Sequence, residues 1–318
     1  MIFDAFNGDA DGICALHQLR LAEPVESTLI TGVKRDIGLL KKIDAATGDE
    51  VNALDIAVEK NTAALVGMLE KGVKVRWFDH HNPGELPVHP NFQANIDTSA
   101  DACTSLLVDR HLNGLHRVWA IAAAFGDNLH AAARAAAEPL GLSESELDQL
   151  RELGECLNYN GYGDSLEDLH FHPAELYRQL HPYRDPFAFM RESAAFQTLR
   201  AGYAADMASA RACQPSEQRP SGAVFILPDA AWAWRVSGVY ANDLATAHPQ
   251  RAHALLTRSP KGYYVVSVRA PLSNKSGADE LCKRFETGGG RKAAAGINVL
   301  PEDRIPDFIA AFFEAWPA

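Results

Sequence analysis

Long apolar runs are missing from this sequence. A membrane-spanning helix needs about 20 consecutive apolar residues, and no stretch of the 318 residues comes near that length. We therefore expect no membrane partner. The first residues also lack the basic and apolar segments of a secretory leader, so we expect a cytoplasmic protein.

Paired cysteines are missing too. The five cysteines are scattered along the chain, and no two of them have CxxC spacing. Neither a zinc ribbon nor a disulfide framework is therefore supported, and a reducing cytoplasm is the simplest setting. The five are Cys14, Cys103, Cys156, Cys213 and Cys282.

Blocks of positive charge are also lacking. The chain has 30 Lys and Arg against 41 Asp and Glu, a formal net charge of −11. Long duplex nucleic acid is bound largely through clustered Lys and Arg, so it is not an expected partner. A nucleic-acid substrate would be short and held in a local pocket. The GxSxG, Walker A and HExxH motifs are absent as well.

The first 100 residues alternate between strand-like and helix-like segments. This alternation predicts parallel βαβ units, in which ligands bind at the carboxyl ends of the strands. Strands are expected at residues 1–6, 27–32, 51–56 and 73–78, and helices at residues 13–21 and 61–71.

The rest of the chain divides into a helical part and a second alternating part. Helices are expected at 102–111, 115–125, 131–138 and 192–212, and another begins at Ser143, where Glu146 completes a capping box. A stretch rich in Pro, Ser and Gly at 214–222 indicates a linker. Beyond it, strands are expected at 223–227, 252–257, 263–269 and 293–299, and helices at 239–247, 278–285 and 305–316.

These patterns predict an α/β protein with two domains. Residues 1–200 would form a parallel-sheet domain with a helical extension. Residues 201–222 would form a helical end and linker, and residues 223–318 a smaller α/β domain.

Acidic and imidazole side chains stand where the predicted segments end. Hard divalent cations favour carboxylate oxygens, and mixed Asp and His sites suit Mn²⁺. The set therefore predicts a divalent-metal centre at one edge of the sheet. Its members are Asp9 and Asp11 on a Gly-containing turn, Asp55, the triplet Asp79-His80-His81, and Asp127.

Most members of this set have a structural alternative when taken singly. The turn with Asp9 and Asp11 could merely cap the following helix. Asp55 and Asp127 could be ordinary turn residues. The triplet is the stronger signal, because a buried strand that ends in three such groups has no obvious packing reason.

A second strong feature is the run Gly288-Gly289-Gly290-Arg291. Glycine N–H groups can bind an anion, and Arg291 can hold a phosphate through two hydrogen bonds. Arg269, at the end of a predicted strand, is a further candidate. The alternatives are a flexible glycine turn and a solvated surface charge. His170, His172, Trp232 and Trp234 are weaker candidates, for which surface or strand-edge packing roles are favoured.

Taken in order along the chain, these residues resemble the DHH phosphoesterase superfamily. The resemblance covers nearly the whole chain, because the glycine run is similar to that of the DHH-associated C-terminal domain. Size and layout are most similar to the nanoRNase and 3′-phosphoadenosine 5′-phosphate phosphatase branch, with RecJ-type exonucleases as larger relatives. The resemblance implies hydrolysis of short oligonucleotides or small phosphorylated nucleotides.

The resemblance also implies a role for each residue. Two ions, usually Mn²⁺ with Mg²⁺ as the alternative, would activate a water. Asp79 would orient His80, and His81 would contact the scissile phosphate. Gly289, Gly290 and Arg291 would hold the other end of the substrate. The first ion would be held by Asp9 and Asp55, and the second by Asp11, Asp55, His80 and Asp127.

Three positions depart from the family pattern. Ala5 stands where many relatives have a His, and Asn7, kept here as a candidate metal ligand, stands where RecJ-like members have an Asp. Arg291 replaces a frequent His, and Arg cannot exchange protons at neutral pH. Two alternatives therefore stay open: a polyphosphate- or pyrophosphate-cleaving enzyme, and a phosphonucleotide-binding protein with weakened catalysis. Homodimer formation is also open.

Overall fold

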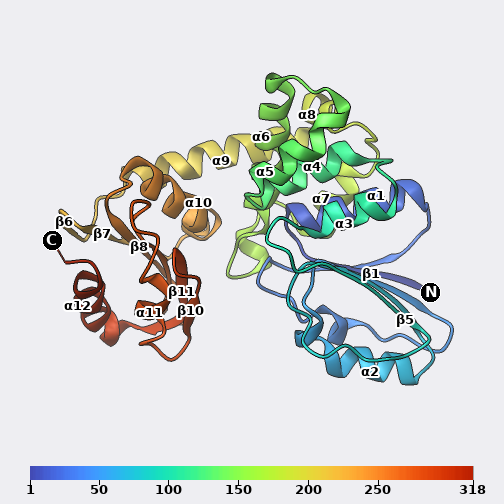
Figure 1. Ribbon diagram of the computed structural model, residues 1–318, viewed down its shortest axis with the longest axis horizontal. Helices are drawn as coiled ribbons and strands as arrows, with labels where there is room; N and C mark the ends of the chain where they lie inside the picture. The colour runs from blue at the N-terminus through green and yellow to red at the C-terminus, as the bar shows by residue number, and fades with distance from the viewer. Residues whose placement is uncertain (318) are drawn as a thin grey trace. The chain divides into compact units, whose positions relative to one another are not determined.

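The computed structural model describes residues 1–317, which form two compact units, residues 1–201 and residues 202–317 (Figure 1). The division between the units falls within the long helix α9 (Ala194–Ala212). Among the described residues, no helix is both long and apolar enough to span a bilayer.

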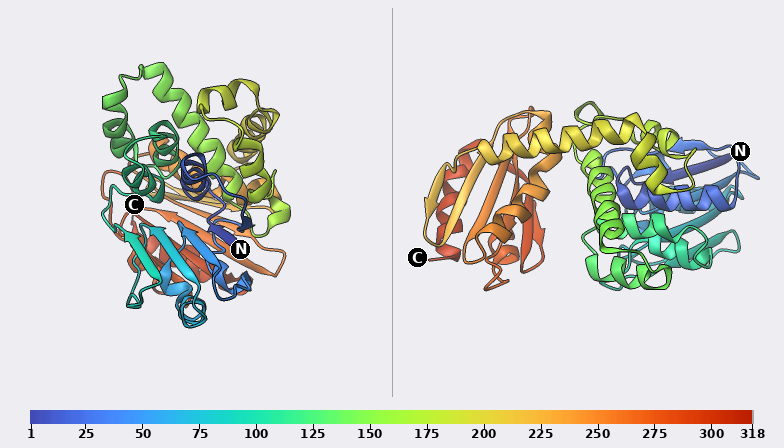
Figure 2. Two further views of the ribbon diagram at one scale, coloured as in Figure 1. Left: turned by 90° about the vertical axis from the view of Figure 1, so that its right-hand side faces the viewer. Right: turned by 90° about the horizontal axis from the view of Figure 1, so that it is seen from above.

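Unit 1 is built on a five-stranded, wholly parallel sheet, which confirms the predicted fold class. The strand order is β2-β1-β3-β4-β5, and the left view of Figure 2 shows the arrows running in one direction. Four of these strands match predicted ones. The strands are β1 (Ile2–Phe6), β2 (Thr28–Ile30), β3 (Glu50–Leu54), β4 (Lys74–Asp79) and β5 (Phe92–Ile96), of which β5 was not predicted.

Helices cover both faces of this sheet because its side chains alternate between two apolar cores. Phe6, Leu54 and Phe78 point into one core, and their neighbours Ala5, Ala53 and Trp77 point into the other. The first face is covered by α1 (Ala10–Ala22), α3 (Thr104–His111) and α4 (Arg117–Gly126), and the second by η1 (Leu39–Lys42), η2 (Val58–Lys60) and α2 (Thr62–Glu70) (Figure 1).

A helical layer follows the sheet in the sequence, as the helical patterns predicted. Ser143 caps α6 (Glu144–Gly161), and its capping box with Glu146 is formed. Tertiary packing keeps Leu150, Leu153 and Leu157 of α6 fully buried. The layer contains α5 (His130–Ala137), η3 (Glu138–Leu140), α6 (Glu144–Gly161), η4 (Leu166–Asp168), α7 (Pro173–Leu180), α8 (Pro186–Glu192) and the start of α9.

Unit 2 contains a six-stranded mixed sheet in the order β10-β11-β9-β8-β7-β6. Phe225 packs edge-on against Tyr240 of α10 (Ala231–Ala247). Val224 instead points into a core with Phe308 and Phe312 of α12 (Ile305–Ala315). The strands are β6 (Glu217–Arg219), β7 (Gly222–Leu227), β8 (Ala252–Arg258), β9 (Tyr263–Arg269), β10 (Gly288–Gly290) and β11 (Ala294–Pro301). The helices are α10 (Ala231–Ala247), α11 (Ala278–Cys282), η5 (Glu302–Arg304) and α12 (Ile305–Ala315).

Two local expectations in this unit need correction. The stretch 214–222 contains β6, which pairs antiparallel with β7 and so extends the sheet. Helix α10 begins at Ala231, eight residues before the predicted start. Trp232 and Trp234 therefore lie on a helix rather than at a strand edge, and Trp234 is buried.

Candidate metal centre

The predicted acidic residues of unit 1 gather at the carboxyl edge of its parallel sheet. Asp9 follows β1, Asp55 follows β3 directly, and Asp79 is the last residue of β4. Asp11 lies in the first turn of α1, and Asp127 is the C-cap of α4. All but Asp127 are almost fully buried, so their charges must be balanced within the protein or by a bound cation.

The Asp-rich turn has a structural role as well as acidic side chains. Asp9 is the N-cap of α1, and its Oδ1 accepts hydrogen bonds from the N–H groups of Asp11 and Gly12, both at 3.1 Å. Asp11 reaches to another helix, where its two carboxylate oxygens accept from the N–H groups of Thr104 and Ser105 at 2.7 Å each. These are the first amides of α3, whose helix dipole favours a negative charge there.

Asp55 adopts a backbone conformation that side-chain-bearing residues rarely use. Its φ angle is +58°, in the left-handed region, where strain clusters at functional sites. The Asp55 N–H donates to the carbonyl of Phe78, which ties the turn to β4. The Thr104 hydroxyl donates to Asp55 Oδ1 at 3.2 Å. The backbone and the carboxylate of Asp55 are therefore each held by a hydrogen bond.

His80 lies at the centre of the acidic cluster. Its Nε2 is 3.3 Å from Asp55 Oδ1, 3.9 Å from Asp127 Oδ2 and 4.0 Å from Asp11 Oδ2. Oxygen and nitrogen ligands that share a divalent ion stand roughly 3 Å apart, given metal–ligand bonds of about 2.1 Å. The donor set is therefore near the spacing that a Mn²⁺ or Mg²⁺ ion needs. Two overlapping groups share this spacing: Asp11, His80 and Asp127, and Asp55, His80 and His81.

Asp79 pairs with His81 and not with His80, which corrects the role implied by the family resemblance. His81 Nδ1 is 2.7 Å from Asp79 Oδ1, and Asp79 is fully buried behind the imidazole. The hydrogen bond to Asp79 raises the pKa of His81 above its ordinary value, against the opposing effect of burial. The hydrogen bond to Asp79 thus holds the His81 ring in place, while 42% of the His81 side chain stays exposed.

Burial and mutual repulsion shape the titration of the acidic cluster. Burial, followed by the nearby carboxylates of Asp11, Asp9, Asp127 and Asp79, raises the pKa of Asp55 well above its ordinary value. Burial also raises the pKa of Asp127 to about 6, although Lys34 opposes that shift. A bound divalent cation would relieve both effects, because it favours the ionised carboxylates.

Lys34 is a site residue that the sequence analysis missed. It lies on the loop after β2, and its Nζ is 2.6 Å from Asp9 Oδ2 and 3.3 Å from Asp127 Oδ1. The same Nζ donates to Asn158 Oδ1 at 3.1 Å and lies 5.4 Å from the centre of the Tyr162 ring. The one available signal was its place after a predicted strand, at the same edge of the sheet as the aspartates.

Asn7 contacts the backbone of Lys34. Its side-chain N–H donates weakly to the Lys34 carbonyl at 3.4 Å. The Asn7 Oδ1 is buried and has no hydrogen-bond partner within residues 1–317. Whether Asn7 binds a metal ion stays a prediction.

The glycine run of unit 2 forms a strand rather than a flexible loop. Gly288–Gly290 is β10, paired antiparallel with β11. A Cβ at Gly288 would lie 1.8 Å from the carbonyl oxygen of Cys282, and Gly290 has a φ of +142°. Packing against α11 and backbone geometry therefore require glycine here. The N–H groups of Gly288 and Arg291 donate to the carbonyls of Phe285 and Ala294.

The other predicted residues have identified contacts. Arg269 donates to Asn242 Oδ1 at 2.6 Å and to the carbonyls of Val268 and Gly238. His170 pairs with the Tyr159 hydroxyl, and His172 caps α7. These contacts support packing and capping roles for the two histidines. Binding of a substrate by Arg269, Gly289 and Arg291 stays a prediction.

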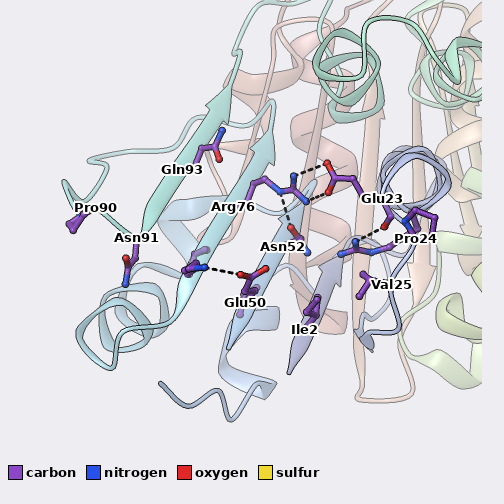
Figure 3. Close-up of a pocket in the computed structure, with 14 residues that line it drawn as sticks. Ile2, Glu23, Pro24, Val25, Glu50, Asn52, Arg76, Pro90, Asn91 and Gln93 are labelled. Atoms are coloured by element: carbon purple, nitrogen blue, oxygen red, sulfur yellow. Dashed lines mark hydrogen bonds and ion pairs between the residues drawn. The ribbon is translucent and has the colours of Figure 1, made fainter. Parts of the chain in front are cut away.

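A cavity of unit 1 lies at the opposite end of the strands from the acidic cluster. It has a volume of about 600 Å³ and is lined by residues near the amino ends of β1, β3 and β4 (Figure 3). Its charged side chains pair with one another: Arg76 with Glu23, Lys74 with Glu50, and Arg20 with Asp4. Because these charges are already balanced, we do not assign the candidate site to this cavity.

Comparisons with solved structures show which fold this is. The chain is similar to the exonuclease RecJ bound to manganese, with 18% identity and a TM-score of 0.64 over 99% of this chain and 89% of that one. It is also similar to RecJ in complex with Mn²⁺ from Thermus thermophilus (19%, TM-score 0.66, 98% of this chain), of which it spans about half, 51%.

A third similar structure matches nearly end to end. It is the pGpG-specific phosphodiesterase PggH from Vibrio cholerae, with 15% identity and a TM-score of 0.56 over 98% of both chains. No protein-family model and no curated protein matches the sequence. At these identities the similarity establishes a shared two-part fold.

Proposed function

We propose that this protein is a metal-dependent phosphoesterase of the DHH type that hydrolyses short oligonucleotides or small phosphorylated nucleotides. The observation that carries the proposal is the convergence of three carboxylates, Asp11, Asp55 and Asp127, on His80 Nε2 within 4.0 Å. Oxygen-rich sites with one imidazole suit Mn²⁺ or Mg²⁺. The shared fold supports the same interpretation, since the similar structures are of an exonuclease and a phosphodiesterase.

In the proposed reaction a metal ion held by these four residues would activate a water and offset charge on the phosphate. The protein's own groups act around it. The amides of α3 fix Asp11, and Thr104 fixes Asp55. His81, whose Nδ1 is hydrogen-bonded to Asp79, would offer its other ring nitrogen to a phosphate oxygen.

Unit 2 carries the other group of candidate substrate-binding residues. Arg291 is exposed next to the strand Gly288–Gly290, and a guanidinium can hold a phosphate through two hydrogen bonds. The net charge of −11 argues for a short substrate held by few such contacts. We also keep a cytoplasmic location as part of this proposal.

The test is turnover of a substrate panel with Mn²⁺. The panel contains a linear dinucleotide, a trinucleotide, 3′-phosphoadenosine 5′-phosphate, a cyclic dinucleotide and polyphosphate. We expect cleavage of a short linear nucleotide by the wild type and a loss of at least about 100-fold with His80→Ala, whereas His170→Ala serves as the matched control with near-normal turnover. Cleavage of polyphosphate alone would support the pyrophosphate-cleaving alternative. No cleavage with retained Mn²⁺ binding would support the binding-protein alternative.

A further inference from the structure

The Lys34 ammonium is held at the acidic cluster by both its backbone and its side chain. The Lys34 N–H donates to the carbonyl of Gly161 at 2.8 Å, and its own carbonyl accepts from Asn7. Gly161 itself lies against Asp9, because a Cβ there would stand 2.9 Å from the Asp9 Cβ. The backbone hydrogen bonds to Gly161 and Asn7 thus fix the position of the Lys34 backbone next to the acidic cluster.

The three hydrogens of the ammonium meet three oxygens of the site. These are Oδ2 of Asp9 at 2.6 Å, Oδ1 of Asn158 at 3.1 Å and Oδ1 of Asp127 at 3.3 Å. An ammonium donates three hydrogen bonds and accepts none, so this geometry satisfies it completely. The Lys34 side chain is only 26% exposed. Its charge is therefore directed at the acidic cluster rather than at solvent.

Asp9 has little capacity left to bind a metal ion. Its Oδ1 accepts two backbone N–H groups and its Oδ2 accepts the Lys34 ammonium. Neither group of metal-capable side chains within residues 1–317 includes Asp9. The neighbouring positions add no strong ligand: Ala5 is a buried methyl group, and Asn7 offers one neutral amide oxygen.

We infer that Lys34 serves as a built-in cation at Asp9, so that the site binds one divalent ion and not two. The ion belongs with Asp11, Asp55, His80 and Asp127, and Lys34 supplies the second positive charge beside it. This differs from the first ion at Asp9 and Asp55 that the family resemblance implies. The inference rests on the proposed metal centre but is independent of the substrate.

The charge balance of the cluster is consistent with this assignment. Five carboxylates meet there, and Lys34 contacts two of them, Asp9 and Asp127. A second divalent ion at Asp9 would have to share its carboxylate with the ammonium at hydrogen-bond distance. Like charges at such a short distance repel strongly in a buried site. The ammonium therefore excludes the ion as long as it stays in place.

The experiment counts Mn²⁺ ions bound per chain in the full-length protein. Equilibrium dialysis with elemental analysis gives the number, and electron paramagnetic resonance separates an isolated Mn²⁺ from an exchange-coupled pair. We expect one uncoupled ion in the wild type and none with His80→Ala. Lys34→Met keeps most of the side chain but removes the charge, and we expect it to bind a second ion near Asp9. Lys34→Arg keeps the charge, and we expect it to bind one.

The outcomes that overturn the inference are distinct. Two coupled ions in the wild type would contradict it directly. One ion in both the wild type and a folded Lys34→Met variant would show that something other than the ammonium excludes the second ion. Should Lys34→Met not fold, as judged by circular dichroism, the wild-type count alone decides. No bound Mn²⁺ in the wild type would overturn the proposed function together with this inference, whereas two ions would overturn only the inference.

Discussion

At the scale of single residues, the candidate site is costly to the folded protein without metal. Asp55 combines a φ of +58° with full burial among four other carboxylates. Native proteins keep such strain and repulsion mainly where function needs them. The cost should therefore be relieved by a change that keeps the shape and removes the charge.

We predict that Asp55→Asn stabilises the metal-free protein while abolishing hydrolysis. Because the pKa of Asp55 is raised in the folded state by burial and neighbouring carboxylates, its ionised form at pH 7 favours unfolding. The sign follows from linkage: the folded state binds more protons, so stability falls as pH rises above the ordinary pKa of an Asp. Asn also tolerates a left-handed backbone. Denaturant unfolding with a chelator should show a higher free energy of unfolding than the wild type, by about 0.5–2 kcal/mol, the usual size of a single stabilising substitution.

The matched control for this substitution is Asp44→Asn, at an exposed aspartate of unit 1 outside the acidic cluster. It should leave both turnover and metal-free stability nearly unchanged, because substitutions at exposed surface positions change stability little. A loss of stability in Asp55→Asn, relative to this control, would contradict the account of a strained, repulsive cluster.

At the scale of elements, close backbone approach positions the site. Gly161 ends α6 against Asp9, and an added Cβ would meet the Asp9 Cα at 3.0 Å and the Gly8 carbonyl at 3.3 Å. We predict that Gly161→Ala destabilises unit 1 by about 1–3 kcal/mol, as overpacking does. Urea unfolding of the metal-free protein measures this loss of stability.

The matched control is Gly67→Ala in α2, where an added Cβ meets nothing within 4 Å. Because alanine favours a helix over glycine, this variant should gain about 0.5–1 kcal/mol. If Gly161→Ala and Gly67→Ala changed the free energy of unfolding in the same direction, steric contact at Gly161 would not be the cause.

Helix α1 also carries a buried histidine that should make stability depend on pH. His17 is fully buried, its Nε2 is 2.9 Å from the Tyr183 carbonyl, and burial lowers its pKa to about 3. Below pH 6.5 the unfolded chain takes up a proton at His17 that the folded protein does not. The folded protein therefore becomes less stable as the pH falls. Between pH 7 and pH 5 this loss amounts to about 2 kcal/mol.

We predict that His17→Gln removes most of this loss, since glutamine keeps the hydrogen bond to Tyr183 but does not titrate. Hydrogen exchange of the β1 amides at the two pH values reports the free energy of unfolding of unit 1. His253→Gln, at a histidine of unit 2 whose pKa burial also lowers, should leave that pH dependence as in the wild type. An equal loss in wild type and His17→Gln would refute the assignment.

The elements also show how far the sequence predicts this structure. Four of the parallel strands were predicted because each is an apolar run between turn residues. Strand β5 was missed because its residues Gln93 and Ala94 are exposed, and it is held by pairing with β4 rather than by its own burial. The start of α10 was missed for a similar reason, since Trp232 and Trp234 suit a strand as well as a helix.

The site residues that lie at strand ends could be predicted from the sequence. The side-chain pairings that depend on tertiary contacts could not. Asp55, Asp79 and His80 come together because parallel strands share a carboxyl edge. No local pattern indicates that the Lys34 side chain reaches Asp9, or that Asp79 pairs with His81 instead of His80. Such pairings depend on loop paths and rotamers that a single sequence does not encode visibly.

At the scale of the whole molecule, metal binding should stabilise one unit and not the other. All four proposed ligands lie in unit 1. An ion that binds only the folded state adds about 2.7 kcal/mol at roughly 100 times its dissociation constant. We predict slower hydrogen exchange in β1, β3 and β4 with Mn²⁺, and unchanged exchange in β7, β8 and β9. His80→Ala should show no such difference, and protection confined to unit 2 would place the metal elsewhere.

We expect one divalent ion at the carboxyl edge of the parallel sheet of unit 1. Anomalous diffraction at the manganese edge, from crystals grown with Mn²⁺, tests it most directly. We expect a single peak among Asp11, Asp55, His80 and Asp127, with the Lys34 ammonium still hydrogen-bonded to Asp9. No peak at these residues would contradict the metal centre, and a second peak at Asp9 would contradict the role of Lys34.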